Sequence, residues 1–243
     1  MRKEPIYMKK RHSSMITNIS RITAAILSAV ALIVFVTGCV SVELPFFSSK
    51  PSINLDTGVK NMFTNAHVGE QIYFGMYENS VICWDVLAEK DDKLLLVTHD
   101  IIREAKYDET FDGTADWSES NCRNWMNKSF YESAFTDEEK KIIIKSTNKN
   151  TTWANSTRTP GDTLDYVFAL SLDEVCTYYE ADYARQAYDL CGRSCMWWLR
   201  TPGCGSNVVM FVDEYGSIDR DGGFVYNAYG GYRPAMWVDI SEL

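Results

Sequence analysis

The stretch from Met196 to Val238 reads MWWLRTPGCGSNVVMFVDEYGSIDRDGGFVYNAYGGYRPAMWV and decides the fold class. Its apolar runs are short, and glycine-containing turns separate them. In chain order the runs and turns are Val208–Val212, Tyr215-Gly216, Ile218, Gly222-Gly223, Phe224–Tyr226, Gly230-Gly231 and Arg233–Val238. Because glycine readily adopts the positive φ of tight turns, this alternation predicts a series of antiparallel strands.

Three more strands are predicted nearer the N-terminus. Gln71–Tyr77 and Val81–Ala88 are rich in β-branched and aromatic residues, and a polar Glu78-Asn79-Ser80 turn joins them. This pattern predicts a β-hairpin. Lys93–Thr98 is a further apolar run, reached through the polar turn Glu89–Asp92, and it predicts the third strand.

Helices are predicted between these two groups of strands. A Ser or Thr followed three residues later by Glu is a capping box, in which both side chains satisfy free backbone N–H groups. The predicted helix starts are Ser118 (with a helix through Asn127), Thr136 with Glu139, and Ser171 with Glu174. Ile142–Ile144 gives the second helix its apolar side, and the polar stretch Lys145–Asp162 predicts a surface loop.

The order of strands, helices and strands predicts an α+β domain with antiparallel sheets and a few helices. The chain lacks a repeat of strand, helix and strand, the pattern that builds a parallel sheet. The fold class is therefore predicted to be α+β, preceded by an N-terminal hydrophobic signal helix.

Residues 1–38 are predicted to be a lipoprotein signal peptide. Basic residues precede an uncharged, mostly apolar run, Ile22–Val36, and the sequence Val36-Thr37-Gly38-Cys39 follows. Small residues before the cut are what a signal peptidase requires, and the four residues resemble a lipobox. We therefore expect cleavage after Gly38, a lipid on Cys39 and an extracytoplasmic, membrane-anchored protein. The alternative is an uncut membrane anchor, because no charge occurs from Ile22 to Val42.

Residues 39–68 are predicted to be a tether, and residues 69–243 the folded domain. The tether is poor in periodic apolar residues and contains Pro, Ser and Asn. The whole chain has a net charge of −9, and removal of the basic signal peptide leaves the rest near −14. Such a surface repels phosphate backbones, so nucleic acid is not expected as a partner.

Several motifs, in this order, carry a family resemblance. They are Tyr73–Tyr77, Trp84–Leu87, Arg123–Asn127, Trp197–Gly203 and Gly231–Val238. Together they resemble a bacterial family known as domain of unknown function 6273, over roughly Gly69–Ile240. That family is similar to the C-type lectin-like fold of formylglycine-generating enzymes and of retroelement-variable proteins. The resemblance implies a lectin-like fold, but one fold hosts many reactions.

Two groups of residues are expected to have different roles. Large aromatic and paired arginine side chains usually build a core, so the predicted structural residues are Trp197, Trp198, Arg200, Arg233 and Trp237. Tyr, Asn and Asp around turns supply contact area and adaptable hydrogen bonds. In the retroelement-variable relatives the late region is the ligand surface. The predicted ligand-binding residues are Asn207, Asp213, Tyr215, Asp219, Asp221, Tyr226, Asn227 and Tyr229. Ordinary polar turn residues are the alternative reading of this group.

No cofactor, metal site or catalytic residue is predicted. Asp213, Glu214, Asp219 and Asp221 could supply oxygen ligands to Ca²⁺, but they form only a fragment of a calcium loop. The soft thiolates of Cys191 and Cys195 could hold copper, which the resemblance to the uncharacterised family disfavours. Catalytic histidine motifs, nucleophile elbows and phosphate loops do not occur in the sequence.

The sequence therefore supports three hypotheses of function. The first is a cell-surface lipoprotein that binds an extracellular glycan, peptide or protein through its lectin-like domain. The second is a copper-thiolate oxidase-type enzyme that uses a cysteine pair. The third is a structural protein of the cell envelope.

Overall fold

The computed structural model describes residues 58–243, except residues 112, 154–155, 158–159, 228–229 and 242. The predicted signal peptide 1–38, the lipidation site Cys39 and the tether up to residue 57 lie outside the described residues. Within the described part, no helix combines the length and the apolar character needed to cross a bilayer.

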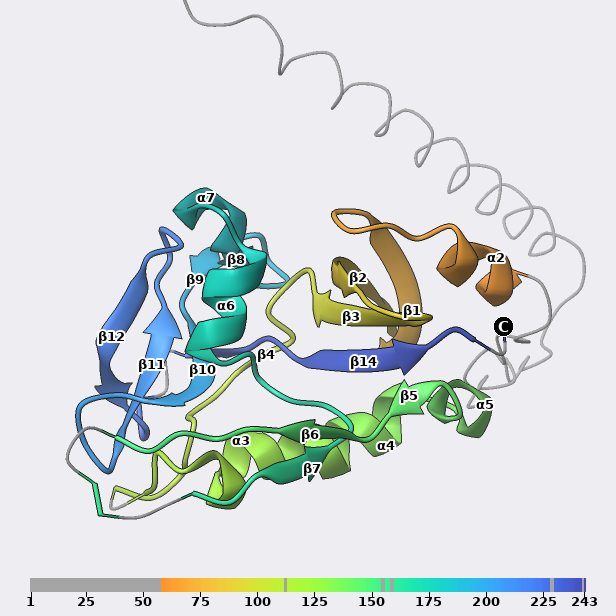
Figure 1. Ribbon diagram of the computed structural model, residues 1–243. Helices are drawn as coiled ribbons and strands as arrows, with labels where there is room; N and C mark the ends of the chain where they lie inside the picture. Colours follow the sequence, from red (N-terminus) through yellow and green to blue (C-terminus); the bar gives the residue numbers. More distant parts are fainter. Residues whose placement is uncertain (1–57, 112, 154–155, 158–159, 228–229, 242) are drawn as a thin grey trace, which may run out of the picture. The chain divides into compact units, whose positions relative to one another are not determined.

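One five-stranded sheet has the strand order β1-β2-β3-β14-β5 and is antiparallel throughout (Figure 1). Its strands are β1 Gln71–Tyr77, β2 Ser80–Glu89, β3 Lys93–Thr98, β14 Ala235–Asp239 and β5 Ile143–Ile144. The predicted hairpin is confirmed, with Tyr77 paired to Ser80. Glu78 and Asn79 between them have φ of 47° and 65°, as the tight turn of a two-residue hairpin loop requires.

A second five-stranded sheet has the order β12-β11-β10-β13-β4. Its strands are β12 Ile218–Phe224, β11 Val208–Val212, β10 Trp197–Pro202, β13 Gly231–Tyr232 and β4 Arg103–Glu104. The β10–β13 pair is parallel and the other pairs are antiparallel. The predicted turn at Gly222-Gly223 is wrong, because both residues lie inside β12. Gly222 has a φ of 88° there, and a Cβ would meet the Val209 carbonyl oxygen at 2.7 Å.

The helices are short, and none of those in the described part is longer than seven residues. They are α2 Gly58–Thr64, the 3-10 turn η1 Trp117–Glu119, α3 Asn121–Asn124, the π-helical segment η2 Trp125–Phe130, α4 Tyr131–Ala134, α5 Asp137–Lys140, α6 Leu172–Tyr178 and α7 Asp182–Arg185. Both predicted capping boxes are confirmed, at the starts of α5 and α6. The predicted helix after Ser118 instead begins after Ser120, whose hydroxyl accepts the Arg123 amide, and it continues to Ala134.

Two predictions around residue 145 are corrected. Ile143 and Ile144 form β5 instead of a helix, because they pair with Val238 and Trp237 of β14. The predicted surface loop contains a strand at its start. Two small sheets complete the domain, namely β6 Ser146–Asn148 with β7 Thr163–Asp165, and β8 Ala187–Tyr188 with β9 Ser194–Cys195.

The folded domain begins earlier than the predicted boundary at residue 69. Phe63 of α2 is fully buried and packs edge-on against Phe74 of β1, with ring centroids 5.2 Å apart. Ala66 after the helix is also buried. Burial of a phenylalanine ring stabilises a fold by about 2 kcal/mol, so this segment belongs to the domain and not to the tether.

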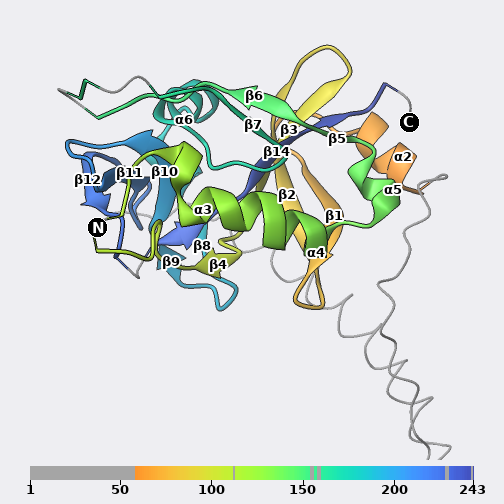
Figure 2. The same cartoon turned by 90° about the horizontal axis from the view of Figure 1, so that it is seen from below.

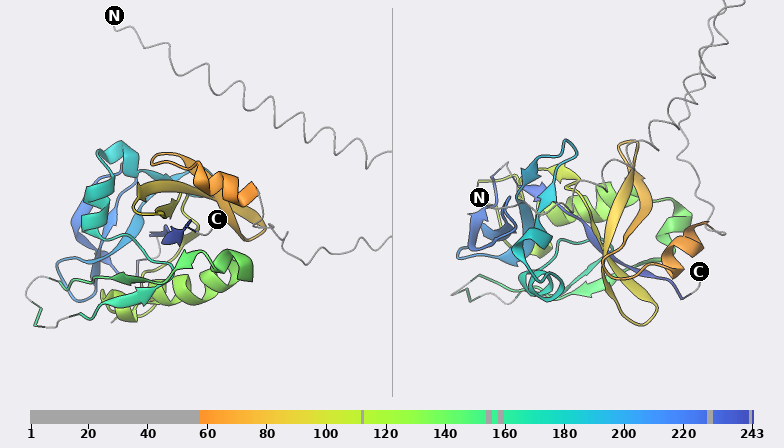
Figure 3. Two further views of the ribbon diagram at one scale, coloured as in Figure 1. Left: turned by 45° about the vertical axis from the view of Figure 1, so that its right-hand side comes forward. Right: turned by 90° about the horizontal axis from the view of Figure 1, so that it is seen from above.

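The described architecture is α+β with mostly antiparallel sheets, as the sequence predicts. The α3–α4 segment runs along one side of the domain, next to the β6–β7 hairpin (Figure 2). Helix α2 lies at one end, beside β1, whereas the β11–β12 hairpin and α7 lie at the other end (Figure 3). The first described residue, Gly58, is therefore at the end opposite the β10–β12 part of the second sheet.

Candidate functional site

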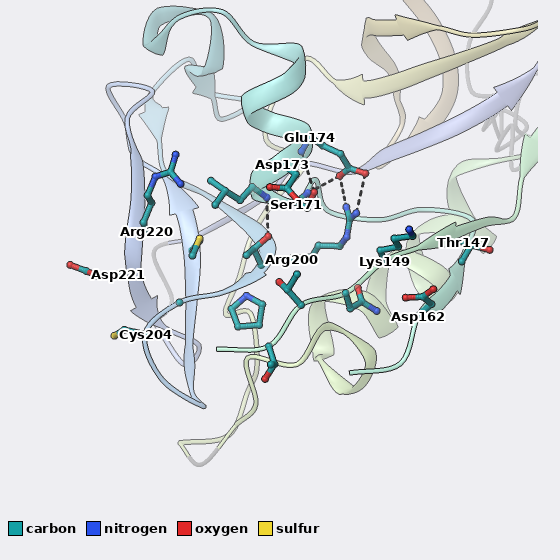
Figure 4. Close-up of a pocket in the computed structure, with 18 residues that line it drawn as sticks. Thr147, Lys149, Asp162, Ser171, Asp173, Glu174, Arg200, Cys204, Arg220 and Asp221 are labelled. Atoms are coloured by element: carbon teal, nitrogen blue, oxygen red, sulfur yellow. Dashed lines mark hydrogen bonds and ion pairs between the residues drawn. The ribbon is translucent and has the colours of Figure 1, made fainter. Parts of the chain in front are cut away.

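A groove of about 1020 Å³ lies where three segments of the domain meet (Figure 4). This volume is at the upper end of what small-molecule sites show. The strands β10–β12 form one wall and the arms of the β6–β7 hairpin form the other, while the start of α6 lies between them. The residues used below are Lys149, Asn150, Thr152, Asp162, Leu172–Glu174, Arg200, Pro202, Met210, Arg220 and Asp221.

Arg200 of β10 lies at the base of the groove and is only 5% exposed. Its Nη1 and Nη2 atoms donate to the Glu174 carboxylate at 2.5 and 3.0 Å, and Nη1 also donates to the Ala169 carbonyl at 2.8 Å. The guanidinium stacks over the Phe168 ring at 5.4 Å. Since Glu174 neutralises the charge, Arg200 brings little net charge to the base of the groove.

The β6–β7 wall is fixed from behind by a buried carboxylate. Asp165 is fully buried and accepts four hydrogen bonds of 2.7–2.9 Å. The donors are Trp117 Nε1, Arg123 Nε, Asn148 Nδ2 and Thr163 Oγ1. Because η1, α3, β6 and β7 all contribute a donor or the acceptor, this network joins the hairpin to the helical segment.

Asn150 orients the loop above that network. Its Nδ2 donates to the Gly161 carbonyl at 2.9 Å and to Thr163 Oγ1 at 3.2 Å. Both partners are on the other arm of the hairpin, so the amide nitrogen points across the loop. The amide oxygen Oδ1 is thereby left as an acceptor on the opposite side.

Three buried polar atoms of the groove have no hydrogen-bond partner among the described residues. They are Arg200 Nε, Asn150 Oδ1 and Thr152 Oγ1. Most buried polar atoms in proteins have a partner, and one without costs about 1–3 kcal/mol. Other such atoms, Thr98 Oγ1, Tyr179 Oη and Arg233 Nη1 among them, do not line the groove. All of these atoms are buried, so none of them is open to a molecule that enters the groove.

The rim of the groove carries charges of both signs. Arg220 and Asp221 lie on the β12 side, Lys149 and Asp162 on the β6–β7 side, and Asp173 at the start of α6. None of these five side chains forms an ion pair within the described part of the chain. Mixed charges at the rim suit a ligand with polar or charged groups of both signs.

Of the eight predicted ligand-binding residues, the described structure brings only Asp221 to the groove. Asp213 accepts the amides of Tyr215 and Ser217 and closes the β11–β12 turn. Asp219 accepts the Gly222 amide at 2.8 Å and supports the irregular part of β12. These two carboxylates therefore act on the local backbone, and the Tyr215 side chain beside them is 69% exposed.

Three other predicted residues, Asn207, Tyr226 and Asn227, lie at the opposite end of the β11–β12 hairpin. Val208 pairs with Phe224 there, whereas Val212 pairs with Ile218 next to the turn, so about 14 Å of strand separates the two ends. Asn207 precedes β11, and Asn227 donates its amide to the Phe224 carbonyl. Tyr226 stacks on the Phe224 and Phe111 rings at 5.2 and 4.8 Å. Tyr229 lies outside the described residues.

Comparison with known proteins identifies the family. The family model described as Domain of unknown function (DUF6273) matches residues 91–240. The chain belongs to this family. The match begins after the β1–β2 hairpin, so the motifs Tyr73–Tyr77 and Trp84–Leu87 precede it. No curated protein and no solved structure matches the chain significantly.

The predicted structural residues of the DUF6273 region are buried or partly buried. Trp197, Trp198 and Arg233 are at most 2% exposed, and Trp237 packs partly buried against the core. Trp198 Nε1 donates to the Ala105 carbonyl at 3.0 Å, and Trp197 Nε1 to the Arg185 carbonyl at 3.0 Å. Arg200 belongs to this group by burial and also lines the groove.

A second polar cluster of the DUF6273 chain surrounds Arg233. The guanidinium donates to Asp85 at 3.2 Å and to the Thr98 carbonyl at 2.8 Å, and Asp85 also bonds to His99 Nδ1 at 2.9 Å. Burial alone would raise the pKa of Asp85, but the hydrogen bond from His99 and the nearby positive charges hold it below its usual value. The hydrogen bond to Asp85 raises the pKa of His99.

The thiol beside this cluster is poorly suited to nucleophilic attack. Burial, followed by the Asp85 charge, raises the pKa of Cys83 to about 11. A thiol with a raised pKa is protonated at neutral pH and reacts slowly. Cys83, beside the Asp85–His99 pair, is therefore not an activated nucleophile.

The six cysteines in the described part of this DUF6273 chain are unpaired. Cys83, Cys122, Cys176, Cys191, Cys195 and Cys204 are all free thiols. Among the described residues, the side chains close enough to share a metal ion are Glu104, Asp189 and Cys195, within 4.8 Å of one another. Arg193 forms ion pairs with both carboxylates, at 2.9 and 2.6 Å, which explains their proximity. The group includes neither Cys191 nor the carboxylates considered for calcium.

Most groove residues could not be identified from sequence. Lys149, Asn150 and Thr152 lie in the polar stretch predicted to be a surface loop, where many residues look alike. The one sequence signal was the Ser171–Glu174 capping box, because Glu174 of that box also pairs with Arg200.

Proposed function

We propose that this DUF6273 chain is an extracytoplasmic lipoprotein, anchored through Cys39, whose lectin-like domain binds an extracellular glycan, peptide or protein. The ligand lies in the groove between β10–β12, α6 and the β6–β7 hairpin. One observation carries the proposal, namely the groove of about 1020 Å³, whose rim residues Lys149, Asp162 and Asp221 form no ion pair within the described part of the chain. Charged rim groups without an internal partner can bind polar groups of a ligand.

The signal motif Val36-Thr37-Gly38-Cys39 supplies the anchor in this proposal.

Binding is tested with the full chain in detergent micelles, probed against arrays of glycans, peptides and purified surface proteins. Thr151 lines the groove and is exposed, so Thr151→Trp fills the groove without disturbing the core. Thr177, exposed on α6 outside the groove, gives the matched control Thr177→Trp. We expect Thr151→Trp to weaken binding at least about tenfold and Thr177→Trp to leave it unchanged.

Two results would overturn the proposal. Failure of the wild-type chain to bind any array would favour a structural envelope role, and equal binding by both variants would place the ligand outside the groove. The anchor has a separate test in the mass of the mature N-terminus. An intact chain without lipid on Cys39 would reject the lipoprotein part.

A further inference from the structure

Exposed tyrosines lie at the end of the domain formed by α7 and the β11–β12 turn (Figure 3). Tyr183 of α7 is 79% exposed, and Tyr215 of the turn is 69% exposed. Tyr188 of β8 and Leu190 after it are also exposed, so these segments hold four of the ten large hydrophobic side chains that are exposed in the described part. Single exposed rings are ordinary on a protein surface, whereas several together mark an interaction surface. The surface, here called the α7 face, is formed by residues 180–195 and 213–217.

Hydrogen bonds hold the segments of the α7 face together. Arg185 Nε of α7 donates to the Gly216 carbonyl of the turn at 2.7 Å. The Ser194 hydroxyl of β9 donates to the Glu214 carbonyl, which joins the β8–β9 hairpin to the same turn. Tyr215 lies between these two contacts in the chain, so its backbone is fixed and little conformational freedom is lost when a partner binds its ring.

The α7 face is acidic. It holds five carboxylates and two guanidinium groups, which give a net charge of −3. Both guanidinium groups, on Arg185 and Arg193, are already paired with carboxylates. The side chains of Glu180 and Glu214 are exposed and form no ion pair within the residues that the structure describes. The charges left open to a partner are therefore negative.

Exposed tyrosine rings beside unpaired carboxylates suit a cationic partner. A lysine ammonium or an arginine guanidinium is attracted to the face of a tyrosine ring and also to a carboxylate. A partner with anionic groups is repelled by this face, and a neutral glycan would leave both carboxylates without a counter-charge. The α7 face therefore favours lysine and arginine side chains over anionic and neutral groups.

We infer that the α7 face binds a basic polypeptide segment, whose lysine or arginine side chains lie over Tyr183 and Tyr215 and pair with Glu180 and Glu214. The inference goes beyond the proposed function, because none of these four residues lines the groove. Exposed charge pairs set the rate and the specificity of association, while the rings supply contact area at a low entropic cost.

The test uses the full chain in micelles of a neutral detergent and two fluorescein-labelled dodecapeptides, one of alternating glycine and lysine and one of alternating glycine and glutamate. Anisotropy measures their dissociation constants, and we expect the lysine peptide to bind and the glutamate peptide not to bind. Tyr183→Ala with Tyr215→Ala should weaken binding of the lysine peptide about tenfold, because each exposed cation–π contact contributes about threefold. The double variant with Phe at both positions keeps the rings and should bind within about twofold of the wild type. Tyr73→Ala, which removes a 54% exposed ring of β1, is the control and should leave binding unchanged.

Glu180→Gln with Glu214→Gln should weaken binding about fivefold at low salt, and less at about 150 mM salt, where exposed charges are screened. Asp137→Asn with Glu138→Gln, both exposed on α5, changes the net charge by the same amount and should have little effect. Equal weakening by these two charge variants would show attraction to the net charge of the whole chain and would overturn the inference. Unchanged binding by the double Ala variant, or no binding of the lysine peptide to the wild type, would overturn it as well, and neither result bears on the groove.

Discussion

Removal of the charge of Glu174 tests whether the Arg200–Glu174 pair holds the base of the groove. Glu174→Gln keeps the shape of the side chain, and glutamine can still serve as the third residue of the capping box with Ser171. The variant therefore isolates the lost charge. Arg200, 5% exposed, would then be a buried cation without its carboxylate.

The expected cost follows from the burial of the two partners. Loss of one partner of a fully buried pair costs about 3–5 kcal/mol. Glu174 is 24% exposed, so water compensates part of this, and we expect a loss of about 2–3 kcal/mol in the free energy of unfolding. For a domain of this size that loss lowers the Tm by about 4–10 °C.

Urea unfolding of the full chain, followed by tryptophan fluorescence, measures this loss. Glu138→Gln is the matched control, because Glu138 pairs with Lys141 at the same 2.5 Å while both side chains are more than 60% exposed. Such a surface pair contributes about 0–0.5 kcal/mol. A loss below about 1 kcal/mol in Glu174→Gln, or equal losses in the two variants, would refute the reasoning.

Three further predictions concern other parts of the domain. Phe63→Ala should lower the free energy of unfolding by about 3 kcal/mol, because the ring is fully buried against Phe74. A loss under about 1 kcal/mol in urea unfolding would show that α2 is not packed as part of the folded domain. Gly216→Ala should cost about 2–4 kcal/mol in the same assay, because Gly216 has a φ of 86° and a Cβ would collide with the Asp182 carbonyl. Asp85→Asn should flatten the pH dependence of the free energy of unfolding at both acidic and alkaline pH. In the wild type, the raised pKa of His99 gives stability below the usual pKa of 6.5, and this stability is lost as pH rises through the folded pKa. The lowered pKa of Asp85 gives stability above the usual pKa of 3.8, and this stability is lost as pH falls through the folded pKa. Thermal melts from pH 3 to pH 9 check this, and an unchanged pH profile in the variant would contradict it.

Local patterns predicted local structure well. The β1–β2 hairpin and the capping boxes of α5 and α6 depend on residues within a few positions of one another, and all three are confirmed. The errors occur where contacts with distant segments of the chain determine the local secondary structure. Ile143 and Ile144 extend along β14, about ninety residues later in the chain, and this pairing outweighs the helical pattern of the sequence before them.

The groove was harder to predict for the same reason. Its residues come from four separate stretches, 147–162, 171–174, 200–210 and 220–221, and nothing local brings these together. Of the predicted ligand-binding residues, Asp213 and Asp219 accept hydrogen bonds from neighbouring amides. A polar residue in a turn is explained equally well by turn geometry and by ligand contact, so composition could not separate the two roles.

Two buried charged residues hold the groove in shape. Asp165 accepts four hydrogen bonds and joins the β6–β7 wall to the helical segment. Arg200, 5% exposed at the base, donates through Nη1 and Nη2 to Glu174 and through Nη1 to the Ala169 carbonyl. Because the walls are held by Asp165 and the base by the Arg200–Glu174 pair, a ligand that enters the groove does not need to reorganise the site.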